Sequence, residues 1–206
     1  MPLVRAAVLP GEKPPADADG DMTALLADLH SDDSSRRRQA VRGLALHPWA
    51  VPALCARLGV ETAASVRSVI FTVLIGLLSA ATVHGLLPLL RSEDVGLRNA
   101  AIEALQQMPD SLAPCVGDLL ADNNSDVRIC TVNVLGALAD RRAPRWLEEV
   151  LRHDPHVNVC AAAVEGLAEL GDAESRPALE ALPKRFPDEP FIAFVVKAAL
   201  QRIGAG

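Results

Sequence analysis

The sequence repeats one pattern at intervals of 30 to 33 residues, and this period limits what the chain can fold into. In four copies an arginine is followed seven residues later by a leucine: Arg37 with Leu44, Arg67 with Leu74, Arg98 with Leu105, and Arg128 with Leu135. Two further copies keep Leu167 and Leu200 but have Cys160 and Ala193 in place of the arginine. Repetition at such a period is typical of a solenoid, in which each short unit stacks on the next.

The composition predicts that each unit is a pair of antiparallel helices. Half of the residues are hydrophobic, and there are only four Phe, two Trp and no Tyr. The apolar residues are mainly Ala, Leu and Val, which suits closely packed helices better than strands. Good N-cap residues, Asp33, Asp94 and Asn124, stand four positions before three of the arginines. We therefore expect an all-α, right-handed αα superhelix.

The pattern predicts about five and a half helical hairpins. Residues 1–20 contain four prolines and read as a flexible tail, and residues 21–206 form the repeat domain. The expected helices are 22–30, 34–46, 49–58, 63–78, 81–91, 95–108, 111–121, 125–139, 142–152, 157–170, 174–185 and 190–203. Prolines that suit the first turn of a second helix are Pro52, Pro114, Pro144 and Pro177. Pro88 and Pro183 come later in their helices, so we expect a kink or an early end there.

Charge and cysteine content exclude several classes of protein. A net charge of −6 argues against a protein whose main task is to bind nucleic acid, although Arg36, Arg37, Arg38 and Arg42 form one basic cluster. Four cysteines without a CxxC pair indicate a reducing compartment, the cytoplasm. Residues 68–90 lack charge over a length that could span a bilayer, but they are in register with the repeat. We therefore expect no membrane segment.

Three segments carry a resemblance to a known family: DVGLRNAAIEALQQM, SDVRICTVNVLGALAD and HVNVCAAAVEGLAELGD. They resemble HEAT-type repeats, specifically the short variety of phycobilisome lyases, and the likeness covers roughly residues 25–203. The resemblance implies that Asp and Arg of each unit form a ladder along the stack. It would give Arg37, Arg67, Arg98 and Arg128 a structural role. The change to Cys160 and Ala193 leaves this ladder in doubt for the last two units.

The sequence contains no catalytic motif of the common kinds, such as GxSxG, a Walker loop, GxGxxG or HExxH. The best metal candidates are His153, Asp154, His156 and Cys160. They do not form the spaced set of four ligands that a zinc site shows. Cys55, Cys115 and Cys130 read as small buried hydrophobes. We expect no catalytic residue, no metal and no cofactor.

These observations favour a non-catalytic scaffold or adaptor that binds a partner protein along its concave face. The residues expected to contact the partner lie on second helices: His84, Leu87, Pro88, Pro114, Asp118, Arg145, Trp146, Glu149 and Arg176. Trp146 is either a core plug or a binding anchor. Phe194 on the last helix suggests docking or self-association through the C-terminal end. A bilin-lyase-like enzyme or enzyme subunit is one alternative, and a nucleic-acid-binding HEAT-like protein is another.

Overall fold

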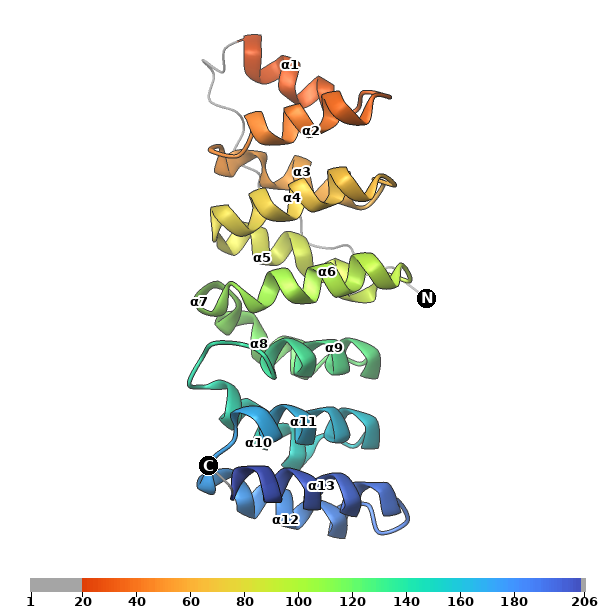
Figure 1. Ribbon diagram of the computed structural model, residues 1–206, viewed down its shortest axis with the longest axis vertical. Coiled ribbons are helices and arrows are strands. Elements are labelled where there is room, and N and C mark those ends of the chain that lie inside the picture. The colour runs from red at the N-terminus through yellow and green to blue at the C-terminus, as the bar shows by residue number, and fades with distance from the viewer. Residues whose placement is uncertain (1–19, 205–206) are drawn as a thin grey trace. The chain divides into compact units, whose positions relative to one another are not determined.

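The computed structural model describes residues 20–204, which form helices joined by short loops and include no strand (Figure 1). The expected flexible tail lies almost wholly outside the described residues. The chain divides into two compact units at Leu89–Leu90, and each is described by itself. No helix within residues 20–204 combines the length and the apolar character needed to cross a bilayer.

Unit 1 contains two helical hairpins preceded by a single helix. Its elements are α1 (Gly20–Asp28), α2 (Ser34–Gly43), η1 (Pro48–Ala50), α3 (Val51–Leu58), α4 (Ala64–Leu77) and α5 (Ala80–Leu86). The 3₁₀ turn η2 (Leu87–Arg91) leads out of it. The uncharged stretch 68–90 is thus interrupted: Leu78 adopts a left-handed backbone with φ of 42°, and Ser79 caps α5 through Thr82 N.

Unit 2 contains three further hairpins and a final helix. Its elements are α6 (Val95–Gln106), α7 (Pro109–Leu112), η3 (Ala113–Cys115), α8 (Val116–Leu120), α9 (Ser125–Leu135), α10 (Ala143–His153), α11 (Val157–Leu170), η4 (Ala173–Ser175), α12 (Arg176–Arg185) and α13 (Pro190–Ile203). The first helices α6, α9, α11 and α13 pack successively in one layer, and the second helices α10 and α12 pack on each other in another.

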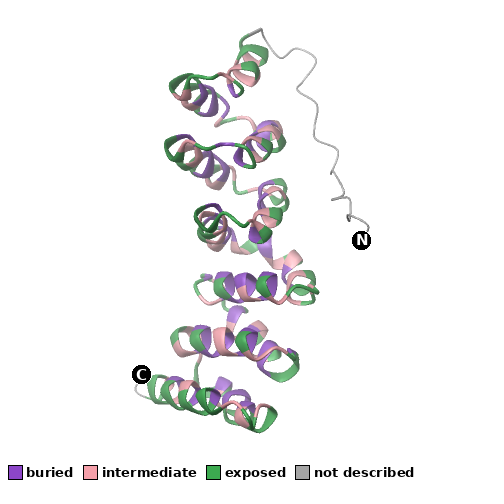
Figure 2. Cartoon of the chain, turned by 90° about the vertical axis from the view of Figure 1, so that its right-hand side faces the viewer, coloured by how far each residue is buried: buried purple, intermediate pink, exposed green. Residues whose placement is uncertain are grey.

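The repeat leucines form the centre of each unit. Those seven residues after the anchor position are fully buried in five copies: Leu44, Leu74, Leu105, Leu135 and Leu167. Burying one such side chain stabilises the fold by roughly 1.5–3 kcal/mol. In the second helices, Leu58, Leu90, Leu151 and Leu182 are buried as well, whereas Leu120 is only half-buried. Figure 2 shows buried residues on the helices of both units.

Two first helices of unit 2 approach very closely. A Cβ added to Gly166 would lie 3.2 Å from the Cα of Gly136 and 2.9 Å from a methyl carbon of Leu147. Gly166 occupies a small-residue position of the repeat, six residues after the anchor position. The absence of side chains at these two glycines therefore allows α9 and α11 to pack backbone against backbone.

Proline positions explain where the helices differ from expectation. The single helix expected over 111–121 is wrong: it is divided into α7, η3 and α8, because Pro114 has no N–H to donate to a helical carbonyl. At Pro88 the expected early end is present, since α5 stops at Leu86. At Pro183 the helix continues for two more residues and ends at Arg185. The N-caps Asp33, Asp94 and Asn124 are confirmed, each accepting a backbone N–H of its own first turn.

Candidate functional site

The repeat arginines share one contact with the backbone. Each donates a hydrogen bond to the carbonyl oxygen six residues before it, at the loop that precedes its helix. The pairs are Arg37 with Ser31 at 2.7 Å, Arg67 with Glu61 at 2.6 Å, Arg98 with Ser92 at 2.6 Å, and Arg128 with Asp122 at 2.8 Å. These carbonyl oxygens are partly shielded from water, and the guanidinium group supplies a hydrogen-bond donor to each of them. We call this contact the rung of a repeat.

Arg37 and Arg128 also hold a buried carboxylate. Arg37 donates Nε and Nη2 to the two carboxylate oxygens of Glu61, at 2.8 and 2.9 Å. Arg128 holds Asp154 in the same bidentate way, at 2.6 and 3.1 Å. Both acids belong to the loop of the following repeat. The backbone carbonyl group of the same residue is the acceptor in the rung of that following repeat. The side chains therefore tie one repeat to the next.

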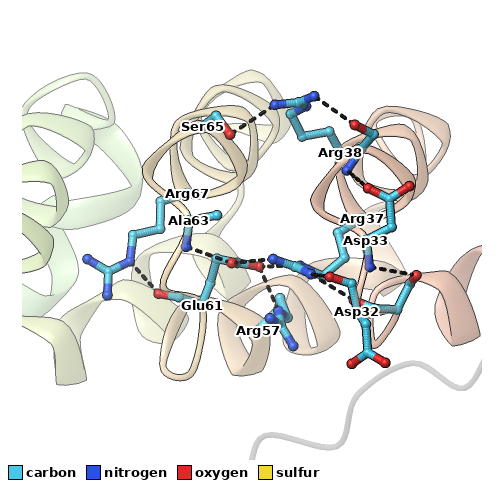
Figure 3. A network of polar contacts seen from close by, with 11 residues as sticks. Asp32, Asp33, Arg37, Arg38, Arg57, Glu61, Ala63, Ser65 and Arg67 are labelled. Carbon is cyan, nitrogen blue, oxygen red and sulfur yellow. Dashed lines mark hydrogen bonds and ion pairs between the residues drawn. The ribbon is translucent and has the colours of Figure 1, made fainter.

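Glu61 is the most heavily bonded of these acids. Its side chain is fully buried and lies between Arg37 and Arg57, as Figure 3 shows, and it also accepts the backbone N–H of Ala63 at 2.8 Å. Burial alone raises the pKa of Glu61, but the hydrogen bonds from Arg37, Ala63 and Arg57 outweigh it and lower the pKa to about 2. The carboxylate is therefore ionised at neutral pH.

At the fifth repeat, where Cys160 replaces the arginine, a different residue makes the contact. Arg185, near the end of α12, donates Nη2 to the carbonyl oxygen of Asp154 at 2.7 Å, and its Nη1 bonds the carbonyl of Leu151. Asp154 stands six residues before Cys160, so Arg185 bonds the carbonyl group that a repeat arginine at position 160 would bond. The rung is thus supplied from the second helix of this repeat.

A cavity of about 450 Å³ lies between α8 and α10 in unit 2, and we call it the α8–α10 cavity. Its walls include Leu120, Val150 and Pro155, and the Arg128–Asp154 pair also lines it. His153 lies on its rim, 3.2 Å from a carboxylate oxygen of Glu149. The lining thus combines apolar side chains with polar and charged ones, and both kinds of contact can serve a small organic ligand.

The metal candidates are used for other contacts. Asp154 holds Arg128, and Cys160 is fully buried with its thiol 3.4 Å from the carbonyl oxygen of Asp154. Burial raises the pKa of the Cys160 thiol to about 11, so it is protonated and a poor metal ligand. His156 is the one residue of the set with a buried side-chain nitrogen, Nδ1, that lacks a partner within residues 20–204. No group of three or more His, Cys, Asp or Glu in that range is arranged to hold a metal.

The residues expected to contact a partner all retain some exposure. Exposed or half-buried side chains in unit 1 are His84, Leu87 and Pro88, and in unit 2 they are Pro114, Asp118, Arg145, Trp146, Glu149 and Arg176. Of these, Glu149 lines the α8–α10 cavity. Trp146 is half-buried, with the guanidinium of Arg142 5.3 Å from its ring centre. Phe194 is 73% exposed.

Sequence reasoning missed the acceptors of the rungs and the role of Arg185. A signal for the acceptors exists, because the position six residues before each anchor position carries a side-chain oxygen in five copies: Ser31, Glu61, Ser92, Asp122 and Asp154. In all five, that oxygen also accepts the backbone N–H two residues later. Nothing in the repeat pattern marks Arg185, since it comes from another helix.

Comparisons with known proteins identify the repeats. Residues 83–159 match the family described as HEAT repeats, and residues 159–182 match the PBS lyase HEAT-like repeat. The "Bilin biosynthesis protein PecE" of Mastigocladus laminosus is 31% identical over 148 residues, which cover 69% of this chain and 54% of that protein. The chain thus spans about half the length of this relative. It is a HEAT-like repeat protein of the phycobilisome-lyase type.

Two solved structures are similar helical repeat proteins. A complex of CpcE and CpcF of phycocyanin lyase from Nostoc sp. PCC7120 has a TM-score of 0.37 and 19% identity, with 93% of this chain and 98% of that chain covered. A designed armadillo repeat protein in complex with the peptide (KR)4 has a TM-score of 0.44 and 17% identity, with 89% and 99% covered.

The relationship to the bilin biosynthesis protein corrects two expectations from sequence. The chain was expected to be a non-catalytic scaffold or adaptor and not an enzyme. Both expectations are wrong, because a relative with this degree of identity is named for a biosynthetic role. The repeat motif alone could not reveal this, since its recurring residues maintain stacking and bonding between repeats.

Proposed function

We propose that this protein acts on a linear tetrapyrrole, as a bilin-lyase-like enzyme or as a subunit of one. The observation that carries the proposal is the 31% identity over 148 residues with the bilin biosynthesis protein PecE. The chain corresponds to about half of that relative. The exposed side chains on the second helices would offer a protein partner a surface for contact.

The α8–α10 cavity is the site we propose for the tetrapyrrole. Leu120 and Val150 offer apolar contacts to the rings, and the half-burial of Leu120 keeps this wall accessible. Glu149 can accept hydrogen bonds from pyrrole N–H groups, whereas His153 can donate one to a propionate. A volume of about 450 Å³ lies in the range of small-molecule sites.

The compartment and the C-terminal surface are part of the same proposal. Cys55, Cys115, Cys130 and Cys160 are all free thiols, which suits the reducing cytoplasm. The exposed Phe191 and Phe194 on α13 provide a surface for a partner protein or for a second copy of this chain.

Binding of biliverdin to the purified protein tests the proposal. A tetrapyrrole held in a fixed conformation by a chiral site acquires visible circular dichroism, and its absorbance bands shift. We expect both changes on titration with the protein. A titration that leaves the absorbance and the dichroism of biliverdin unchanged would contradict the proposal.

A pair of glycine variants tests the proposed location. Gly117 lines the α8–α10 cavity and Gly76 lies in α4 of unit 1, and a Cβ added at either glycine meets nothing within 4 Å. Gly117→Phe should therefore obstruct the cavity, and Gly76→Phe should change an exposed position of unit 1 that does not line it. We expect Gly117→Phe to abolish the induced dichroism and Gly76→Phe to preserve it. Equal binding by both variants would place the tetrapyrrole elsewhere.

A further inference from the structure

Arg98 is a repeat arginine whose Nε–Nη2 edge, which we call its carboxylate seat, holds no carboxylate among residues 20–204. Its Nη1 donates to the carbonyl oxygen of Ser92 at 2.6 Å, and Arg37 and Arg128 use the same nitrogen for their rungs. Arg37 and Arg128 use Nε and Nη2 to hold Glu61 and Asp154. Within residues 20–204 the Nε and Nη2 groups of Arg98 have no partner.

The shared backbone contact fixes how this edge is presented. A guanidinium group is planar, so a bond from Nη1 to a loop carbonyl restrains the direction of the Nε–Nη2 edge. In Arg37 and Arg128 the same bond accompanies a carboxylate on that edge, at 2.6–3.1 Å. Arg98 therefore offers a preformed fork of donors of the kind that binds carboxylates in two other repeats.

The acidic residue that the repeat pattern would place against Arg98 binds another arginine instead. By position in the repeat, the counterpart of Glu61 and Asp154 is Asp122. Its carboxylate pairs with Arg91 and also accepts the backbone N–H of Asn124 at 2.8 Å. Arg91 thus takes the acid that the pattern assigns to Arg98.

A cavity of about 580 Å³ opens at Arg98, between α6 and α9, and we call it the α6–α9 cavity. Polar side chains of Asn99, Asn124 and Asn133 line it, together with the apolar Ile102. The amides can donate or accept hydrogen bonds with the remainder of a ligand. The volume is suited to a small organic molecule and is larger than a single carboxylate needs.

We propose that the α6–α9 cavity binds a carboxylate group of a ligand. This group would bind the Nε–Nη2 edge of Arg98 as Glu61 binds that of Arg37 and Asp154 that of Arg128. Glu93 and Asp126 also line the cavity. Their charges disfavour a doubly charged phosphate more than a singly charged carboxylate. The site lies on the first helices α6 and α9 and does not depend on the tetrapyrrole proposal.

Side-chain nuclear magnetic resonance of the ¹⁵N-labelled full-length chain tests this site at pH 7.5, at which inorganic phosphate is mostly doubly charged. The Nε–H resonance of Arg98 is assigned by its absence from the spectrum of Arg98→Gln. The probes are acetate as a singly charged small acid, N-acetyl-glutamate amide as an acidic side chain, inorganic phosphate, and neutral acetamide. We expect the resonance to shift and saturate with at least one of the two carboxylates and to stay in place with acetamide.

Variants complete the test through the backbone amides of Asn99 and Asn133. Arg98→Gln should weaken carboxylate binding at least about tenfold, because a bidentate charged pair is lost. Arg141→Gln is the matched control, since it removes an exposed positive charge of unit 2 outside the cavity and should leave binding unchanged. The tighter of the two carboxylate probes identifies the source as a small acid or a protein side chain. An unmoved Arg98 resonance, tighter binding of phosphate, or equal weakening by Arg141→Gln would overturn the proposal.

Discussion

Two rungs, that of Arg37 in unit 1 and that of Arg98 in unit 2, differ in whether the arginine also binds a carboxylate. In unit 1 Arg37 is closed by Glu61, which is fully buried and bonded by Arg57 as well. In unit 2 Arg98 makes the same backbone contact but has no carboxylate. The bond to the loop carbonyl is thus common to both units, while the carboxylate is variable. The hydrogen bond to the carbonyl oxygen holds a loop against the helix that follows it. The contact with the carboxylate joins consecutive repeats.

Unit 2 shows that the source of the guanidinium group can vary too. Arg128 is closed by Asp154 in the manner of Arg37, yet the carbonyl of Asp154 itself is bonded by Arg185 from α12. A loop carbonyl in the interior loses its hydrogen bonds to water and needs a donor from somewhere. The repeat tolerates Cys160 because Arg185 supplies that donor.

The largest effect should follow from removing the acid of unit 1. Glu61→Ala leaves Arg37 buried without its counter-charge, and breaking a buried pair costs about 3–5 kcal/mol of the free energy of unfolding. Urea unfolding measures it through the fluorescence of Trp49 in a Trp146→Phe background, since each unit contains one tryptophan. Asp32→Ala removes an exposed acid of the same unit and is the control. A loss as small as that of the control would mean that Glu61 does not hold the repeats together.

The lowered pKa of Glu61 also predicts that the stability of unit 1 depends on pH. The pKa of Glu61 is lowered to about 2, against about 4.3 for an ordinary glutamate. Its contribution to stability is therefore fully present above pH 4.3 and is lost as the pH falls from there toward 2. Urea midpoints of unit 1 at pH 6, 4 and 3 should decline in the wild type more steeply than in Glu61→Gln. Parallel curves for the two proteins would assign the decline to other carboxylates.

Replacement of Arg185, which supplies the guanidinium group of the fifth repeat, should lower the free energy of unfolding moderately. Arg185→Met removes two charge-assisted hydrogen bonds to the carbonyls of Leu151 and Asp154, and we expect a loss of about 1–2 kcal/mol because the side chain is partly exposed. Lys184→Met, at the exposed neighbouring position, should change stability little. If the two arginine positions are equivalent, Cys160→Arg should recover part of the loss in the Arg185→Met background. A double variant less stable than the sum of the single effects would show that position 160 can no longer supply the rung.

Much of the fold followed from periodicity, because stacking places the same demand on every repeat. The first helices, the N-caps Asp33, Asp94 and Asn124, and the buried leucines recur at fixed offsets, so each copy supports the others. The division of the helix at Pro114 was missed because a proline early in a helix is compatible with a continuous helix.

The candidate sites were harder to predict, since they lie where the repeat departs from itself. The α8–α10 cavity opens where Leu120 is half-buried, although it occupies the same place as the buried Leu58 and Leu151. Arg98 has no carboxylate because Asp122 pairs with Arg91. The spacing of the repeat does not reveal which of the two arginines Asp122 binds. Spacing fixes which groups could meet, whereas the pairing is decided by side-chain geometry.

The smallest effect on the free energy of unfolding is expected at Arg98. Its size shows whether Arg98 lacks a carboxylate partner in solution. Arg98→Gln should cost less than about 1 kcal/mol of the free energy of unfolding, because one hydrogen bond to a partly exposed carbonyl is lost. Arg128→Gln, which leaves Asp154 buried without its partner, should cost about 3 kcal/mol or more. Both are measured in urea through Trp146 in a Trp49→Phe background. Equal losses would mean that Asp122 turns from Arg91 to Arg98 and closes the seat from within, which leaves no edge for an external carboxylate.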